Sequence, residues 1–188
     1  MVEKTSTRTA TRDRLLTAAE TLLLTERYDD VSVRGICTAA GVNPAAVHYH
    51  FGSKEALVAA LIEDRLGPVW ADRLAVVDDN ASVSEVVDAV IEPFVELAAD
   101  PVGRMHLRLL AQLVLGRHPL TWNLHWFHMD SWVGLLPDLS VEDSRRRWKL
   151  AFDLIISRFG TGEEISDRSA AALRDFMVAG LTAPKVQQ

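Results

Sequence analysis

Residues 41–57 carry side chains whose types suit contact with a nucleic acid. The segment reads GVNPAAVHYHFGSKEAL. His48 can donate or accept a hydrogen bond at a base edge, and the polar ends of Tyr49 and His50 suit phosphate oxygens. Lys54, with the free amides of a helix that starts beside it, adds a candidate phosphate site.

Capping residues and glycines divide this region into short helices. Ser32 is a hydroxyl N-cap candidate for a first helix, and Gly41 stands where that helix must end and the chain must bend. Asn43 can cap the next helix and Pro44 fits its first turn, while Gly52 closes it. Two short helices joined by a tight glycine turn form a helix-turn-helix, so the region predicts DNA recognition.

The second short helix has two faces. Val47 and Phe51 lie four residues apart and point toward the core. Ala45 lies on the opposite face, and two small residues, Ala45 and Ala46, let the helix backbone approach base edges, where an apolar contact favours a thymine methyl. Taken singly, an exposed Tyr or His means little, because short helices can simply build a small core. Only the whole pattern favours DNA binding.

The segment from Arg12 to Leu57 resembles the DNA-binding domain of the TetR family of bacterial transcriptional regulators. The residues that match the family pattern are Ser32, Val33, Arg34, Ile36, Ala40, Gly41, Val42, Val47, His50, Phe51, Ser53, Lys54, Glu55 and Leu57. Arg34 corresponds to a position that in the family often reaches a base or a phosphate. Cys37 replaces the usual alanine, and Arg27 stands where most members have glycine. The run N-x-A-A-V-x-Y-H-F-G-S-K is also similar to a branch that includes regulators of fatty-acid metabolism.

From the residues and this resemblance together we predict a set of DNA contacts. The set is Ser32, Arg34, Asn43, Pro44, Ala45, Ala46, His48, Tyr49, His50 and Lys54.

The net charge of −6 is unusual for a chain expected to bind DNA. Residues 1–60 contain seven basic and seven acidic side chains, so the whole excess of acid lies in the remainder. At the N-terminus, the basic side chains outnumber the acidic ones; they are Lys4, Arg8, Arg12 and Arg14. We expect a basic arm, disordered when free, that contacts the phosphate backbone or a minor groove, or else a merely solvated terminus.

The rest of the chain shows helical periodicity and no strand alternation, which predicts an all-α protein. A DNA-binding domain of three helices is expected at residues 1–53, and a larger helical domain for effector binding and dimerisation at 54–188. Gly67 and Pro68 are expected to bend the first long helix, and Pro93 lies inside another whose start matches a capping box. The expected long helices are 53–77, 82–99, 102–117, 120–136, 141–159 and 166–181.

The larger domain is rich in bulky apolar and aromatic residues, which can form solid core or enclose an apolar cavity. Because members of the family usually hold a small-molecule effector here, the resemblance implies a ligand site. The candidate residues are Arg108, Leu109, Leu113, Trp122, Asn123, His125 and Trp126. The resemblance also implies a dimer interface on the last two long helices, whose apolar stripe is Leu150, Leu154, Ile155, Ala170, Leu173, Phe176 and Met177.

Enzymatic readings have little support in the sequence. His118, His125 and His128 could suggest a metal site, but no Cys, Asp or Glu completes a recognisable ligand set. P-loop, GxGxxG, HExxH and GxSxG motifs are absent. We therefore expect no catalytic residue, no bound metal and no cofactor.

The prediction is a ligand-responsive repressor that binds a palindromic operator as a homodimer and is released by a small apolar or amphipathic effector. A helical regulator without an effector is the alternative, and a metal-dependent enzyme is a more distant one. One cysteine and the absence of a long apolar run predict a cytoplasmic protein without a membrane partner.

Overall fold

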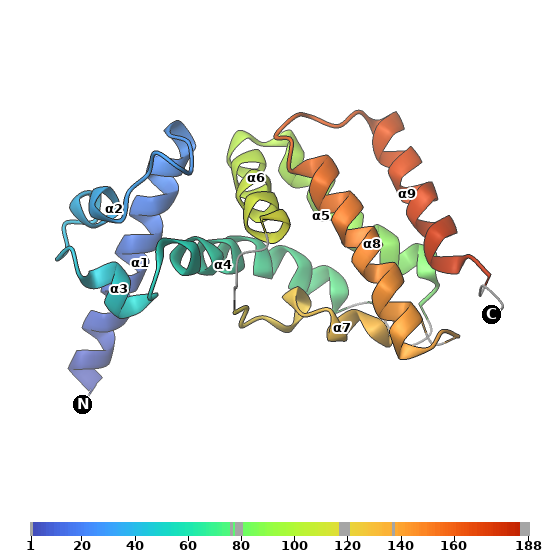
Figure 1. Ribbon diagram of the computed structural model, residues 1–188, viewed down its shortest axis with the longest axis horizontal. Coiled ribbons are helices and arrows are strands. Elements are labelled where there is room, and N and C mark those ends of the chain that lie inside the picture. Colours follow the sequence, from blue (N-terminus) through green and yellow to red (C-terminus); the bar gives the residue numbers. More distant parts are fainter. Residues whose placement is uncertain (1, 76, 78–80, 117–120, 137, 185–188) are drawn as a thin grey trace.

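The computed structural model describes residues 2–75, 77, 81–116, 121–136 and 138–184, with side chains from residue 8 onward. Throughout these residues the chain forms helices and no strand, so the prediction of an all-α protein is confirmed. The molecule is elongated: α1 to α3 lie at one end, α5 to α9 at the other, and α4 runs from one group to the other (Figure 1). We call the first group the head and the second the body.

The head consists of α1 (Val2–Thr25), α2 (Val33–Ala39) and α3 (Ala46–His50), packed against the start of α4 (Lys54–Leu74). Ser32 caps α2 by accepting a hydrogen bond from Gly35 N at 3.0 Å, and Ser53 caps α4 through Ala56 N at 3.1 Å. Both predicted caps are confirmed.

The two predicted glycine turns of the head are also present. Gly41 and Gly52 have φ angles of 60° and 85°, a region that L side chains avoid because Cβ would crowd the next carbonyl oxygen. The chain can therefore reverse sharply after α2 and after α3.

The expectation of a disordered N-terminal arm is wrong, because α1 is helical from Val2. Residues 2–14 contain no proline or glycine, so nothing in them interrupts the helix that the following Leu- and Ala-rich segment propagates.

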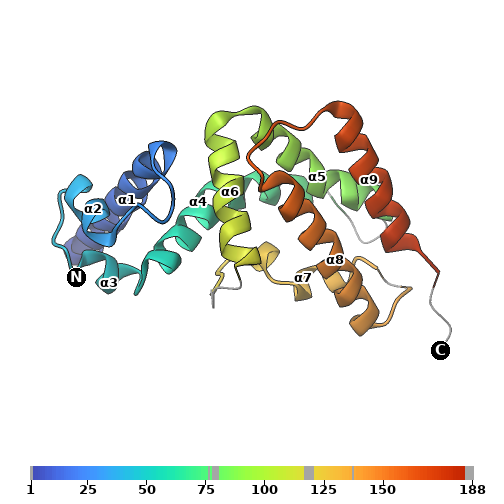
Figure 2. The same cartoon turned by 45° about the horizontal axis from the view of Figure 1, so that its top comes forward.

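The body is built from α5 (Val83–Ala99), α6 (Pro101–Leu115), α8 (Val141–Phe159) and α9 (Asp167–Thr182). The capping box at the start of α5 is present as predicted: Ser82 Oγ accepts from Glu85 N, and Ser82 N donates to the Glu85 carboxylate. Pro93 lies inside this helix. Figure 2 shows α8 and α9 side by side on one flank of the body.

For α4, both the expected end and the expected bend can be compared with the structure. Helix α4 remains helical through Gly67 and Pro68 and ends at Leu74, three residues before the predicted end at Val77. Helix α6 ends at Leu115, and the expected end at Arg117 lies outside the described residues.

The predicted continuous helix at 120–136 is wrong. In the described part of this segment the chain forms a 3₁₀ turn, η1 (His125–Phe127), and one short helix, α7 (Asp130–Val133). Leu124 has an extended backbone, with ψ 130°. Its N–H donates to Glu63 of α4 at 2.9 Å, and the backbone N–H of Asn123 also donates to that carboxylate. The backbone N–H groups that would have bonded within a local helix therefore donate to a carboxylate on another helix.

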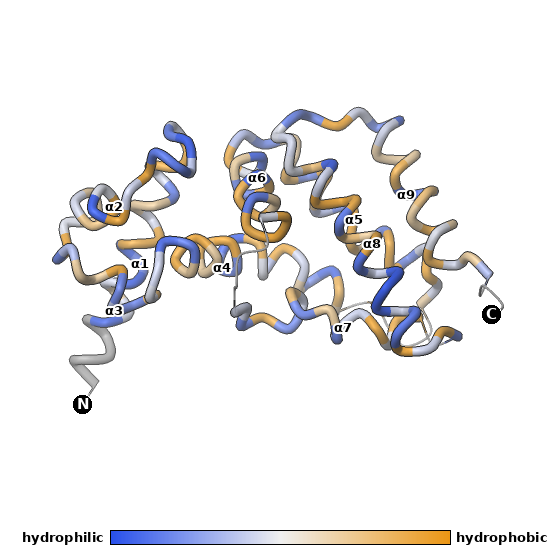
Figure 3. The backbone as a smooth tube through the Cα atoms, in the orientation of Figure 1, coloured by the Kyte–Doolittle hydropathy of each residue, from blue (hydrophilic) through white to orange (hydrophobic). Residues whose placement is uncertain are grey.

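The core is continuous from head to body. Leu15, Ile36 and Val47 are buried in the head, and Trp148 and Ile155 are buried in the body. Hydrophobic residues are prominent along α4 and α6, whereas the start of α8 is hydrophilic (Figure 3). Among the described residues, no helix is long and apolar enough to cross a membrane.

Candidate nucleic-acid interface and body cavity

Helix α3 presents aromatic and polar side chains to solvent. Tyr49 is 70% exposed, and its ring meets that of His50 edge-on with the centroids 5.0 Å apart. The guanidinium of Arg8 on α1 lies 5.6 Å from the Tyr49 ring centroid, and that of Arg12 lies 5.5 Å from Phe51. The first turns of α1 therefore place two cations beside α3.

The two histidines of α3 differ in their surroundings. His48 Nδ1 lies 3.0 Å from the carbonyl oxygen of Gly52. Because a carbonyl can only accept, Nδ1 carries the proton in this contact. Burial, reinforced by the charges of Arg8 and Arg12, lowers the pKa of His50 below its usual value. This lowering favours the neutral form of the His50 ring.

The turn before α3 is fixed by polar contacts. Asn43 Oδ1 accepts from Ala45 N at 2.8 Å, which closes a turn ahead of the first helical residue, Ala46. The expected role of Asn43 as the helix N-cap is therefore wrong: Ala45 occupies that position, and Asn43 instead closes the turn before it. Arg14 reaches across from α1 and donates to the carbonyls of Ala40 and Gly41. This basic residue of the expected arm thus secures the end of α2.

The two predicted contact residues at α2, Ser32 and Arg34, differ in their hydrogen bonding. The hydroxyl of Ser32 is engaged as the N-cap described above, and its residue is exposed. Arg34 is also exposed, and within the described residues its guanidinium makes no hydrogen bond or ion pair. Ala46 is the first residue of α3, Ala45 is its N-cap, and Pro44 precedes them in the turn that follows Gly41.

Lys54 is turned inward rather than toward solvent. Its Nζ donates to the carbonyls of Tyr28 at 2.6 Å and Val31 at 2.8 Å, and lies 4.1 Å from the centroid of the Tyr28 ring. Burial, together with the nearby Glu55, raises the pKa of Tyr28 to about 12. Lys54 therefore ties α4 to the turn after α1, which makes it the weakest of the predicted phosphate contacts.

An ion network joins the head to the body. Arg65 of α4 donates to the carboxylate of Glu20 on α1, with Nη2 2.8 Å from Oε2, and His106 Nε2 of α6 lies 2.8 Å from Glu20 Oε1. Arg65 holds the pKa of Glu20 below its usual range although burial opposes this. Burial lowers the pKa of His106, and its contact with Glu20 opposes that shift. Three helices thus meet at one carboxylate.

The body contains an apolar cavity of about 410 Å³, partly open to solvent, between α4, α5, α6, α8 and the segment around η1 and α7. This size lies within the range of small-molecule sites. Three charged side chains of α8 also line it, and they are Arg145, Lys149 and Asp153. The apolar lining consists of Gly67, Trp70, Phe94, Leu110, Val114, Trp122, Trp126, Phe127, Met129, Trp132, Phe152 and Ile156.

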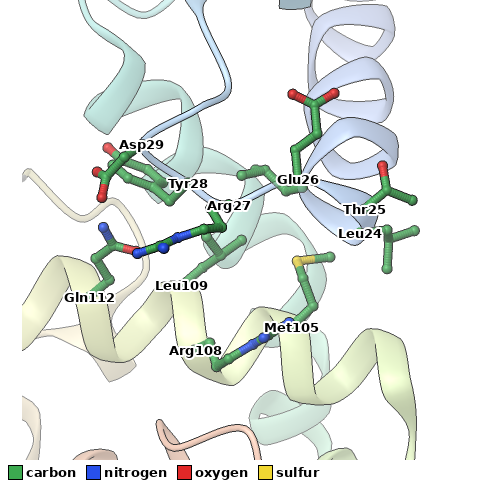
Figure 4. Close-up of a pocket in the computed structure, with 11 residues that line it drawn as sticks. Leu24, Thr25, Glu26, Arg27, Tyr28, Asp29, Met105, Arg108, Leu109 and Gln112 are labelled. Carbon is green, nitrogen blue, oxygen red and sulfur yellow. The ribbon is translucent and has the colours of Figure 1, made fainter.

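The structure divides the predicted ligand residues. Trp122 and Trp126 line this cavity, where Trp122 stacks on Phe127 with centroids 4.9 Å apart. Leu113 is 1% exposed and belongs to the core. Arg108 and Leu109 line a different pocket, beside the head (Figure 4). The expectation that these residues gather around the two tryptophans is wrong, because Leu109 and Leu113 lie on faces of α6 that do not line the cavity.

The two polar candidates near the tryptophans are engaged otherwise. Asn123 Nδ2 donates to Glu63 Oε2 at 2.7 Å, and His125 packs on the ring of Trp126 with centroids 3.7 Å apart. Sequence reasoning missed Lys149 and Phe152, which face the cavity from α8. The signal for them was the spacing of Trp148 and Phe152, which puts two aromatic residues on adjoining turns of one helix face.

The histidines of the metal alternative do not gather with other ligands. His128 Nε2 lies 2.9 Å from the carbonyl oxygen of Trp122, and His118 lies outside the described residues. Within the portion of the chain that is described, no group of three or more His, Cys, Asp or Glu side chains could hold a metal ion.

Known proteins resemble this chain in two ways. The family model described as "Bacterial regulatory proteins, tetR family" matches residues 15–61, which run from α1 into α4. The HTH-type transcriptional regulator BetI of Rhizobium meliloti (strain 1021) is 41% identical over 61 residues, or 32% of this chain and 30% of that protein. UidR of Escherichia coli (strain K12), also an HTH-type transcriptional regulator, is 30% identical over 98 residues, or 52% of this chain and 47% of that protein.

The chain thus spans less than half the length of the curated relatives it matches, whereas the fold is shared over nearly its whole length. The crystal structure of RolR in complex with resorcinol covers 97% of this chain and 98% of its own, with a TM-score of 0.59 and 17% identity. At that identity the likeness shows the fold alone. Residues 15–61 are thus similar to the DNA-binding part of the tetR family of bacterial regulatory proteins, and the rest of the described chain shares the helical fold of such regulators.

Proposed function

We propose that the protein is a DNA-binding transcriptional regulator, most simply a repressor, that acts as a homodimer on a palindromic operator in the cytoplasm. A small apolar or amphipathic effector, bound in the body cavity, lowers its affinity for DNA. In this proposal residues 1–53 read DNA, and residues 54–188 bind the effector and form the dimer. The main support for the proposal is the exposed aromatic and polar face of α3. Helix caps and side-chain hydrogen bonds from neighbouring elements hold this face in position.

The recognition residues support a specific geometry of reading. In the proposed complex α3 enters a major groove, where Ala45 and Ala46 allow close approach and Arg34 approaches from α2. With its Nδ1 engaged by Gly52, His48 directs Nε2 toward the DNA, and we expect this atom to contact a base edge. Tyr49 and His50 then contact phosphates, and Ser32, Asn43 and Pro44 support them from the neighbouring turns.

Selection of binding sequences from random duplex DNA tests the DNA-binding proposal. We expect an inverted repeat whose half-sites lie about one helical turn, or a multiple of it, apart. Arg34→Ala should relax sequence preference at one position of each half-site if the guanidinium reads a base. His48→Ala should relax it at another, whereas Arg168→Ala, far along the chain on α9, should change nothing. Equal affinity of the wild-type chain for selected and scrambled duplexes would end the proposal.

The predicted dimer stripe is divided by the structure. Ile155, Leu173 and Met177 are buried within the chain itself. Leu150, Leu154 and Phe176 remain exposed, at 66%, 37% and 68%. Large apolar side chains left exposed on two adjacent helices are typical of a protein interface. We therefore place the proposed dimer contact on these three residues.

Sedimentation of the purified chain tests the dimer. Leu150→Glu combined with Phe176→Glu should give monomers with little loss of stability, because both positions are exposed in the single chain. A wild-type chain that stays monomeric at micromolar concentration, yet binds an inverted repeat tightly, would rule the homodimer out.

The effector proposal depends on the body cavity. Its aromatic lining favours an apolar or aromatic ligand, and Lys149 offers a cation to a polar group on it, since its contact with Asp153 measures 4.0 Å. RolR has been crystallised with resorcinol, a small aromatic ligand, which supports the same class of ligand here.

Quenching of tryptophan fluorescence by a library of small aromatic and acyl compounds tests this part. A ligand that quenches Trp122 or Trp126 should weaken operator binding, and operator DNA should weaken the ligand by the same factor. Ligands that bind the cavity without changing DNA affinity would instead favour the alternative, a regulator without a small-molecule effector.

A further inference from the structure

A second pocket lies where the head meets the body, on a different face of α6 from the body cavity. We call it the joint pocket; its volume is about 380 Å³, and residues 23–29 of the head and four residues of α6 line it. The four are Met105, Arg108, Leu109 and Gln112, spaced as one face of a helix, whereas Leu110 and Val114 face the body cavity. The two pockets are therefore separate sites.

Two cations of the joint pocket have no partner among the described residues. Arg27 comes from the turn after α1, and Arg108 comes from α6. Within the described residues neither guanidinium makes a hydrogen bond or an ion pair. Figure 4 shows both side chains lying against α6, Arg27 near Gln112 and Arg108 near Met105.

The two acidic residues of the same turn do not neutralise these cations. In Figure 4 the carboxylate of Glu26 points away from α6 along α1, whereas that of Asp29 lies on the same side as Gln112 and the end of Arg27, although no ion pair joins it to Arg27 in the described part of the chain. The side of the joint pocket formed by α6 is therefore cationic, although the whole turn carries both signs of charge.

The stem of Arg108 is held in place by a glycine. Gly162, with φ 74°, lies where a Cβ atom would come within 2.6 Å of Arg108 Cδ. Because glycine has no Cβ, the arginine stem packs closely on this loop and its guanidinium stays at the pocket. The floor below is apolar, since Leu23, Met105 and Leu109 are all buried.

We propose that the joint pocket binds a small organic carboxylate, with its apolar part on Leu23, Met105 and Leu109. Arg27 and Arg108 lie toward opposite ends of the pocket in Figure 4, and in the proposed complex both exposed side chains turn to the carboxylate between them. A guanidinium presents paired N–H donors that match a carboxylate, and the buried floor favours an organic anion over an inorganic one. Since Arg27 belongs to the head and Arg108 to the body, such a ligand joins the two. It would stabilise the arrangement of α1 and α6 in which both guanidinium groups reach it.

Methionine methyl groups provide separate reporters for the two pockets. Met105 lines the joint pocket, Met129 lines the body cavity, and Met177 is buried elsewhere in the core. The full chain, labelled with ¹³C at the methionine methyls, is titrated with benzoate, with its neutral counterpart benzamide, and with inorganic phosphate. Met105→Leu and Met129→Leu assign the signals.

We expect benzoate to shift the Met105 signal saturably, and benzamide and phosphate to bind at least about tenfold more weakly. Arg27→Gln and Arg108→Gln should each lower the affinity for benzoate by about tenfold or more. Arg27→Lys should retain only part of the wild-type affinity, because lysine keeps the charge but loses the paired donors. Arg168→Gln, which removes another exposed and unpaired arginine, is the matched control and should leave binding unchanged.

A benzoate shift confined to Met129, equal binding to the Arg27→Gln/Arg108→Gln double variant, or no saturable shift in the millimolar range would each overturn the proposal. Phosphate that binds as well as benzoate would overturn the assignment of an organic ligand. Both arginines are exposed, so the variants should fold, and the unchanged Met177 signal verifies this. The experiment contains no DNA, and its outcome is therefore independent of the proposed function.

Discussion

The head and the body are stabilised in different ways. In the head, charged side chains each donate to two backbone carbonyls: Arg14 to the end of α2, and Lys54 to the turn after α1. In the body, aromatic rings pack on one another, as Trp132 does on Trp148 and Phe152 with centroids 5.5 and 4.9 Å away. Directional polar contacts fix a surface in one geometry, whereas apolar packing tolerates changes of shape. The difference suits a head that presents a fixed surface and a body that adapts to a ligand.

The largest expected effect lies in the body. Trp148 is fully buried, so Trp148→Ala should lower the free energy of unfolding by about 3–5 kcal/mol. Its indole Nε1 is buried without a partner among the described residues, so Trp148→Phe should be far milder. Urea unfolding followed by circular dichroism measures both. Similar losses for the two variants would mean that the body depends on a directional contact after all.

The network between head and body should make stability depend on pH. The folded pKa of His106 lies below its ordinary value of 6.5, so the unfolded chain binds more protons just below that pH, and stability should fall as pH drops. Glu20, whose pKa is also lowered, adds a further loss as pH falls below its ordinary 4.5.

His106→Gln separates the two contributions. Glutamine can still donate to Glu20 but does not titrate, so the decline just below pH 6.5 should become smaller, with the contribution of His50 and the more acidic decline remaining. Thermal unfolding across this range is the measurement, and an unchanged profile in the variant would contradict the assignment to His106.

Lys54 sharpens the comparison within the head. Removal of its two hydrogen bonds to carbonyls in Lys54→Met should cost about 1–3 kcal/mol of stability. If its amine contacts no phosphate, the dependence of DNA affinity on salt should stay the same in the folded variant. A salt slope reduced by about one unit would instead return Lys54 to the phosphate contacts.

Tyr49→Phe should have the smallest effect on stability, within about 0.5 kcal/mol, because the side chain is largely exposed. If its hydroxyl binds a phosphate, the variant should nevertheless bind all duplexes more weakly, with an unchanged sequence preference. A change in the preferred sequence would show that Tyr49 reads a base.

The elements set by local chemistry could be predicted from the sequence. Ser32, Ser53 and Ser82 cap helices, and Gly41 and Gly52 have positive φ, because each of these depends on a few neighbouring residues.

The misjudged features depend on distant partners. The conformation of the segment at 120–136 depends on its hydrogen bonds to Glu63, which lies some sixty residues earlier in the chain. The orientation of Lys54 depends on its hydrogen bonds to carbonyls more than twenty residues before it. The neighbour that covers the face of α6 with Leu109 depends on how the head packs against the body. Periodicity indicates that a face is apolar, but not which neighbour covers it.

The contact of Glu63 also bears on how fast a ligand can enter. Its side chain is buried and accepts hydrogen bonds from the backbone of Asn123 and Leu124 and from the Asn123 amide. This segment continues into Trp122 and Trp126, which form one wall of the body cavity. If ligands enter through this wall, the hydrogen bonds between the segment and the buried Glu63 carboxylate must first break. Association rates would then be well below the diffusion limit, rise steeply with temperature, and increase in Glu63→Ala.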